Sequence, residues 1–91
     1  MPVDLKAAAA AARRLHEALA LLPVSRWEYP TEYDAEIAKI TAIIASEGGA
    51  VNDRWDGAAV RMHGLRATST SGIAGACRNW ITQARTKAGE L

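Results

Sequence analysis

The sequence lacks phenylalanine and has few other large aromatic side chains, since its 91 residues include only three tryptophans and two tyrosines. Alanine supplies much of the 49 % hydrophobic content instead. We therefore expect helices that pack closely through small residues. A chain of this length supports a single hydrophobic core, which leaves little room for an enclosed active site. One domain spanning residues 1–91 is predicted.

Cysteine and long apolar runs are also scarce. The single cysteine, Cys77, cannot form an intramolecular disulfide, and the chain does not open with the charged and apolar pattern of a signal peptide. No apolar run reaches the roughly 18 residues that a membrane-spanning helix requires. These absences predict a protein of the cytoplasm without a membrane span.

The formal net charge is only +1, but the charged residues are unevenly distributed. Residues 26–56 contain seven carboxylates and three cations, whereas residues 57–91 contain five cations and one carboxylate. If the two segments do not interleave in space, the folded protein has an acidic side and a basic side. The sequence leaves open whether these segments form separate faces.

The spacing of apolar residues predicts three helices. The first covers residues 4–22, with Asp4 as its N-cap and Pro23 as its stop signal. The second covers residues 31–47, with a row of isoleucines on one side and two glycines at its end. The third runs from about residue 72 to residue 88. Basic residues late in this helix suit the negative end of its dipole.

Between the second and third helices the apolar period falls to two, which is typical of strands. Asp56-Gly57 has the composition of a two-residue hairpin turn, and His63-Gly64 is a second, weaker turn signal. We therefore predict a short antiparallel β-meander of two or three strands. If the second turn preserves the register, Arg61 and Arg66 share the solvent-facing side.

The predicted fold class is α+β, with two N-terminal helices, the short meander and a C-terminal helix. We expect the first and third helices, with the isoleucines of the second, to cover one face of the sheet. Trp55 and Trp80 are predicted to be the largest core residues. A free sheet edge offers a route to a homodimer by strand addition, so the sequence permits a monomer or a homodimer.

The side chains of this sequence do not favour catalysis. His16 and His63 lack the spacing of a zinc site and are not positioned by the pattern beside a serine nucleophile. Cys77 falls on the apolar face of the third helix, which is typical of a core residue. We expect no enzymatic activity, no cofactor and no metal site.

The run Thr68-Ser69-Thr70-Ser71-Gly72 directly precedes the third helix. Its hydroxyl groups are preferred N-caps, so they can start the helix without any ligand. The same groups, with Arg66 nearby, can also hold phosphate or another anion at a helix N-terminus. Both interpretations remain open from the sequence.

Two sets of residues are candidates for binding a macromolecule. The first combines carboxylates at the start of the second helix with neighbouring aromatic residues: Trp27, Glu28, Tyr29, Glu32, Asp34 and Glu36. The second, an alternative nucleic-acid or anion site, combines hydroxyl groups with cations of the C-terminal half: Arg61, Arg66, Ser69, Ser71, Arg78, Arg85 and Lys87.

A resemblance bears on the choice between them. The stretch Arg54-Trp55-Asp56-Gly57, the run from Val60 to Gly72 and the pair Asn79-Trp80 resemble the C-terminal half of small phage and prophage proteins of unknown function, over roughly residues 51 to 86. No residue role carries over. The resemblance implies a phage context, in which small accessory proteins of this kind are often inhibitors of host systems, including anti-CRISPR proteins.

We therefore predict a non-enzymatic protein-binding module from a phage or mobile element that evades host defence. Its expected partner is a protein complex of the host, of the CRISPR-Cas effector type, met in the cytoplasm of the host cell. It would bind a basic protein surface and block access of nucleic acid. The alternative is a nucleic-acid-binding accessory protein that uses a basic C-terminal face.

Overall fold

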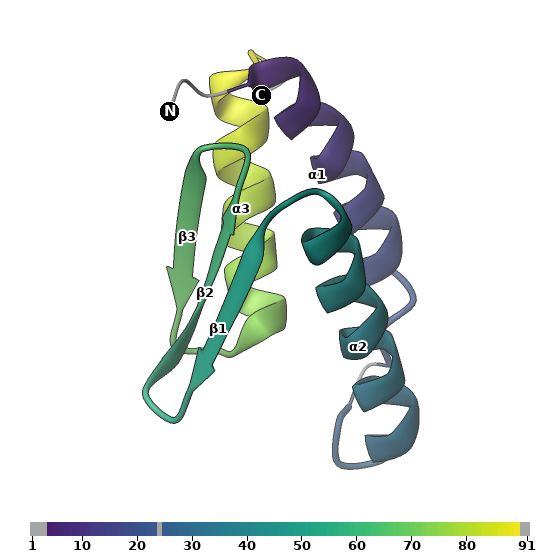
Figure 1. Ribbon diagram of the computed structural model, residues 1–91. Helices are drawn as coiled ribbons and strands as arrows, with labels where there is room; N and C mark the ends of the chain where they lie inside the picture. The colour runs from purple at the N-terminus through teal and green to yellow at the C-terminus, as the bar shows by residue number, and fades with distance from the viewer. Residues whose placement is uncertain (1–3, 24, 90–91) are drawn as a thin grey trace.

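Three helices lie on one side of a three-stranded antiparallel sheet in the computed structural model, which describes residues 4–23 and 25–89 (Figure 1). The elements in chain order are α1 (Leu5–Leu19), α2 (Pro30–Ser46), β1 (Ala50–Arg54), β2 (Gly57–Met62), β3 (Leu65–Ser69) and α3 (Ile73–Lys87). Strand β2 is central, and β1 and β3 are the edges. The predicted α+β fold class is confirmed, and the meander has three strands.

Helix α1 begins where the sequence predicts, because the Asp4 carboxylate accepts a hydrogen bond from the Ala7 backbone N–H at 3.0 Å. The helix ends at Leu19, three residues before the predicted position. Apart from Leu15, its buried side chains are all alanine. These short side chains let α1 pack closely on α3 and α2. Its contacts are mainly with these two helices, whereas the sequence predicted that it covers the sheet.

Helix α2 starts at Pro30, one residue before the predicted start. Proline is favoured there because the first N–H groups of a helix have no intrahelical acceptor. Only Ile40 and Ile44 of this helix are buried, and Gly48, with φ of 77°, ends it as predicted. The N-terminal half of α2 therefore extends beyond the core, and Figure 1 shows its lower end standing apart from the sheet.

The first hairpin loop is displaced by one residue from the prediction. Arg54 pairs with Gly57, so the loop consists of Trp55 and Asp56 rather than Asp56 and Gly57. Gly57 belongs to β2, where its φ is 153° and an added Cβ would lie 3.1 Å from the Ser69 carbonyl oxygen. Glycine is thus required there by the close approach of β3 and by the backbone angle, not by the loop.

The second hairpin loop consists of His63 and Gly64, as predicted. Both residues have positive φ, 52° and 79°, as a type I′ turn requires. The register that this loop imposes pairs Arg61 with Arg66 across β2 and β3. The prediction that these two arginines share the solvent-facing side is confirmed, since both are exposed.

The two tryptophans that the sequence assigns to the core have opposite environments. Trp80 of α3 is fully buried, and its Nε1 donates to the carbonyl oxygens of Met62 and Leu65, each at 3.3 Å. Trp55 is 98 % exposed, so the prediction that it fills the core is wrong. Its position in the loop removes it from the strand alternation that would have pointed it inward.

Truncating these two tryptophans separates their contributions to stability. Trp80→Ala is expected to lower the free energy of unfolding by about 3 to 5 kcal/mol, because it leaves a large cavity. Trp55→Ala, the matched control, is expected to change it by less than about 0.5 kcal/mol. Urea unfolding followed by circular dichroism measures both values. Similar losses in the two variants would contradict the different environments of the two side chains.

Candidate functional sites

One end of the molecule exposes two tryptophans. Trp27 is 95 % exposed and lies in the turn before α2, and Trp55 is as exposed in the loop between β1 and β2. Both loops lie at the lower end of Figure 1. Such exposure is unusual because tryptophan is highly buried on average. We name this region, residues 26–34 and 53–56, the aromatic end.

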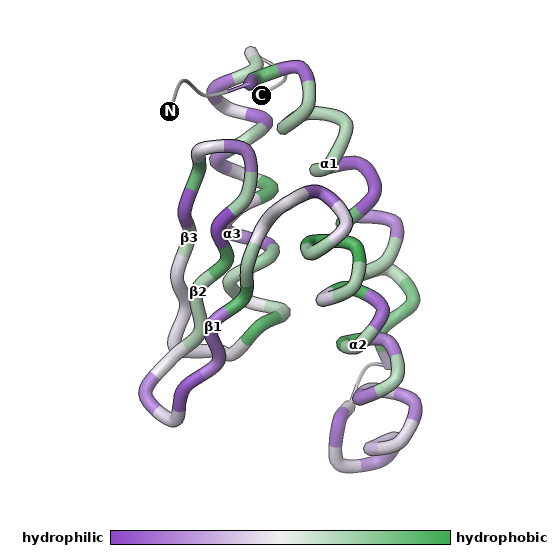
Figure 2. The backbone as a smooth tube through the Cα atoms, viewed as in Figure 1, coloured by the Kyte–Doolittle hydropathy of each residue, from purple (hydrophilic) through white to green (hydrophobic). Residues whose placement is uncertain are grey.

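Carboxylates accompany both tryptophans. Glu28 and Glu32 are exposed beside Trp27, and neither forms an ion pair in the described part of the chain. Asp53 and Asp56 are exposed beside Trp55. Figure 2 accordingly shows a mainly hydrophilic backbone at the hairpin tip between β1 and β2. The aromatic end therefore combines exposed indole rings with negative charge.

The loop before α2 is held by Arg26. Its guanidinium lies 5.9 Å from the centre of the Tyr33 ring, and its Nη2 lies 3.5 Å from the Asp34 Oδ1. The ion pair is solvent-exposed and contributes little to stability, but it neutralises part of the charge of Asp34. A hollow of about 140 Å³ separates α2 from β1 here, and its lining residues are Arg26, Tyr33, Asp34, Ile37, Asp53, Ser71, Gly72 and Ile73.

The predicted acidic site is only partly assembled. The structure brings Trp27, Glu28, Tyr29 and Glu32 to the aromatic end in exposed positions, with Asp34 paired as described. Glu36 does not share these exposed positions. Its carboxylate lies 3.0 Å from Lys39 Nζ, and its side chain is only 16 % exposed.

Sequence reasoning missed the second loop of this site. The alternation along β1 assigned Trp55 to the core, although the signal for a turn lay in the residues directly after it.

The predicted basic residues lie on two different surfaces. Arg61 and Arg66 project from the sheet, on the side away from the helices. Arg78 and Arg85 line a groove of about 390 Å³ between α1 and α3, together with His16. Lys87 is the exposed last residue of α3. A single basic C-terminal face is therefore not formed.

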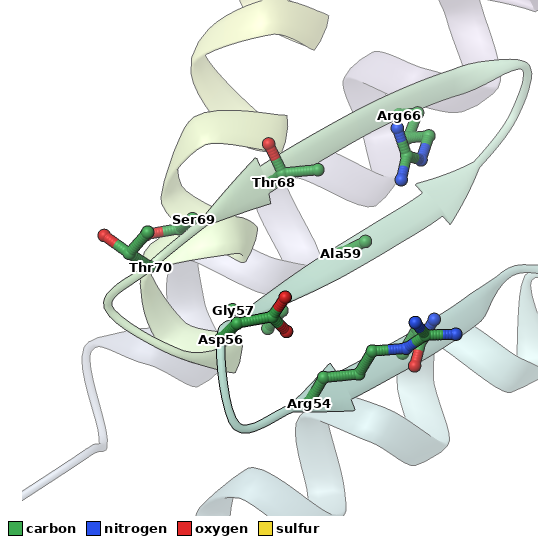
Figure 3. A pocket seen from close by; sticks show the side chains of 10 residues that line it. Arg54, Asp56, Gly57, Ala59, Arg66, Thr68, Ser69 and Thr70 are labelled. Carbon is green, nitrogen blue, oxygen red and sulfur yellow. The ribbon is translucent and has the colours of Figure 1, made fainter.

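The side of the sheet that no described helix covers is named here the outer sheet face (Figure 1). Strand register and the burial of alternate β2 residues place on it Asn52, Arg54, Ala59, Arg61, Arg66 and Thr68. Figure 3 views this face, with Arg54, Ala59, Arg66 and Thr68 in front of the helices.

Two hollows of about 410 and 210 Å³ lie on this face and share Asn52, Ala59 and Arg66. Arg54, which belongs to the acidic segment of the chain, joins Arg61 and Arg66 on this face.

The hydroxyl-rich run shapes the connection between β3 and α3. The N-cap of α3 is Gly72, with φ of 89° and without a side-chain cap, so the interpretation of these hydroxyl groups as N-caps is wrong. Ser69 Oγ instead accepts the N–H of Ser71 at 3.0 Å. Both serines lie against Gly75, where an added Cβ would be 2.5 Å from Ser69 Oγ. Anion binding by this run stays a prediction.

Cys77 lies in the core, and its environment does not favour nucleophilic chemistry. Burial raises the pKa of its thiol from 9.0 to about 11, although the positive charge of Arg78 opposes this rise. Little thiolate therefore exists at neutral pH, and the thiolate is the reactive form. The described residues also contain no group of three or more His, Cys, Asp or Glu side chains that could hold a metal ion.

The pKa of Cys77 predicts a loss of stability in alkaline solution. The unfolded chain releases the thiol proton near pH 9.0, whereas the folded protein keeps it until about pH 11. The stabilising contribution is complete below pH 9 and is lost between these values, by on the order of 2 kcal/mol. Urea unfolding at pH 8 and about pH 10.5 is expected to show a smaller fall for Cys77→Ala than for the wild type. Equal falls would contradict this assignment.

Among the described residues, none of the helices has both the length and the apolar character needed to cross a membrane. The chain matches no protein-family model, no curated protein sequence and no solved structure.

Proposed function

We propose that this chain is a non-enzymatic binding module whose aromatic end docks on a basic surface of a partner protein. The observation that carries the proposal is the nearly complete exposure of Trp27 and Trp55 on two loops at the same end of the molecule. Neither indole supports the fold by burial. Exposed apolar groups gathered in one region are typical of interaction sites.

Tryptophan suits this task energetically. It presents a large apolar surface and one N–H donor, and it is enriched among the few residues that supply most of the affinity of protein interfaces. Each such anchor contributes about 2 kcal/mol or more to binding, which corresponds to a roughly 30-fold change in affinity. Two anchors on separate loops can also fix the orientation of the partner.

The carboxylates determine the charge of the partner. Glu28 and Glu32 beside one tryptophan, and Asp53 and Asp56 beside the other, favour a surface that carries lysine or arginine. Such complementarity raises the association rate and disfavours acidic competitors. The aromatic end therefore fits a basic protein surface with apolar depressions that accept an indole ring.

The resemblance of residues 51–86 to phage and prophage proteins directs the choice of partner. A basic groove that holds nucleic acid has the charge that this site requires. We propose as the first candidate the nucleic-acid groove of a host defence complex of the CRISPR-Cas type, met in the cytoplasm of the host cell. Occupation of that groove would block access of nucleic acid without any catalytic step.

Substitutions at the aromatic end test the proposal. Affinity capture from a nuclease-treated host lysate, with proteins identified by mass spectrometry, is expected to recover a basic protein with the wild type. With the purified partner, Trp27→Ala and Trp55→Ala are each expected to weaken binding by about 30-fold. Reversal of charge in Glu28→Lys/Glu32→Lys should slow association, with a dependence on salt concentration.

Matched controls lie elsewhere on the surface. Leu21→Ala removes an apolar side chain that is 67 % exposed, and Glu17→Lys reverses an exposed charge on α1. Both are expected to bind as the wild type does. Binding that survives both tryptophan substitutions would refute docking through the aromatic end. Wild-type dimers that dissociate in Trp27→Ala/Trp55→Ala, observed by analytical ultracentrifugation, would assign this end to self-association instead.

A further inference from the structure

We propose that the outer sheet face is a second binding site, which holds single-stranded nucleic acid through its phosphate backbone. The site borders the aromatic end at Arg54 and does not depend on the function proposed there. Its cations are Arg54, Arg61 and Arg66, one from each strand of the meander.

The pairing of Arg61 with Arg66 is the first argument. The two residues lie directly opposite each other on neighbouring strands, and like charges in that position destabilise a sheet. Neither arginine forms an ion pair or a side-chain hydrogen bond within the described part of the chain. A polyanion that lies over both guanidinium groups would remove their repulsion. Ligand binding thus explains why the sheet contains a like-charge pair that lowers its stability.

The spacing of the cations is the second argument, because it favours a polymer over a single anion. Arg54 lies opposite Gly57, and Arg61 lies four residues further along β2. At about 3.3 Å per residue, the two positions are roughly 13 Å apart along the sheet. Successive phosphates of one strand can occupy positions spread over such a length.

The side chains between the cations leave room for a ligand. Ala59 lies at the centre of the face, with the polar Asn52 and Thr68 as its partners on the two neighbouring strands. The hollows of about 410 and 210 Å³ meet at Ala59, so a chain can approach the sheet closely here. Figure 3 shows Arg66 and Thr68 on one side of Ala59 and Arg54 on the other.

The shape of the face favours a single strand over a duplex. The described part of this face consists of three paired strands, and no helix projects from it to enter the groove of a duplex. A flexible single strand can follow a shallow positive surface and needs no such element. Asp56 lines one end of the larger hollow, and Asp4 and Glu47 line a further hollow beside Arg61 and Arg66, so the phosphate path lies over the three arginines between these carboxylates.

Fluorescence anisotropy with a labelled single-stranded DNA of about 12 nucleotides tests this site. At about 50 mM salt, Arg61→Thr/Arg66→Thr is expected to weaken binding about tenfold or more. The slope of log K against log salt should become smaller in magnitude by about 1.4, which is roughly 0.7 for each lost phosphate contact. Circular dichroism and urea unfolding should show a folded variant whose stability equals or exceeds that of the wild type, because the like-charge pair is gone.

Arg78→Thr/Arg85→Thr provides the matched control, since it removes the same charge from the groove between α1 and α3. This variant is expected to bind within about twofold of the wild type at moderate salt. Equal weakening by the two double variants would show only a net-charge effect and would overturn the proposal. Absence of wild-type binding at low salt, or equal affinity for duplex DNA, would also overturn it. Loss of DNA binding in Trp27→Ala/Trp55→Ala alone would move the nucleic-acid site to the aromatic end.

Discussion

The fold depends on one buried indole ring. Trp80 is the largest fully buried side chain, and its N–H group is shared by the carbonyl oxygens of Met62 and Leu65, on either side of the loop between β2 and β3. The preceding residue, Asn79, donates from Nδ2 to the Thr68 carbonyl oxygen at 2.8 Å. These bonds attach α3 to the last hairpin. Helix α1 packs on α3, and α2 packs on α1 and β1.

A core built in this way can cover only one side of the sheet. Helix α3 occupies the inner side of β2 and β3, α1 packs on α3 and α2, and only the C-terminal half of α2 reaches the core. This arrangement of the helices therefore leaves the outer sheet face and the aromatic end exposed. A small domain places its few apolar side chains in one core, so the exposed side chains of these two regions contribute little to stability. Packing therefore does not restrict which residue types occur there. One region is positively charged, and the other combines aromatic rings with carboxylates.

Most of the fold could be predicted from the sequence because its signals are local. The helical spacing, the Asp4 cap and the loop at His63 and Gly64 depend on neighbouring residues, and that loop sets the register that pairs Arg61 with Arg66. The first hairpin loop could not be placed, because Gly57 is required by the approach of Ser69 from another strand. That displacement by one residue moved Trp55 from the expected core into water. Strand pairing places Arg54 on the same face as Arg61 and Arg66 and separates all three from Arg78 and Arg85.

The residues of the C-terminal half differ in what their contacts do for the fold. Asn79, Trp80, Ser69 and Gly72 hold α3 on the meander or shape the turn that leads into it, so their presence follows from the fold alone. Trp55 has no such role, because it is 98 % exposed. Trp55 lies at the exposed tip of the scaffold that these four residues help to build. Under the proposed docking, this difference makes the loop between β1 and β2 the first place to look for a partner.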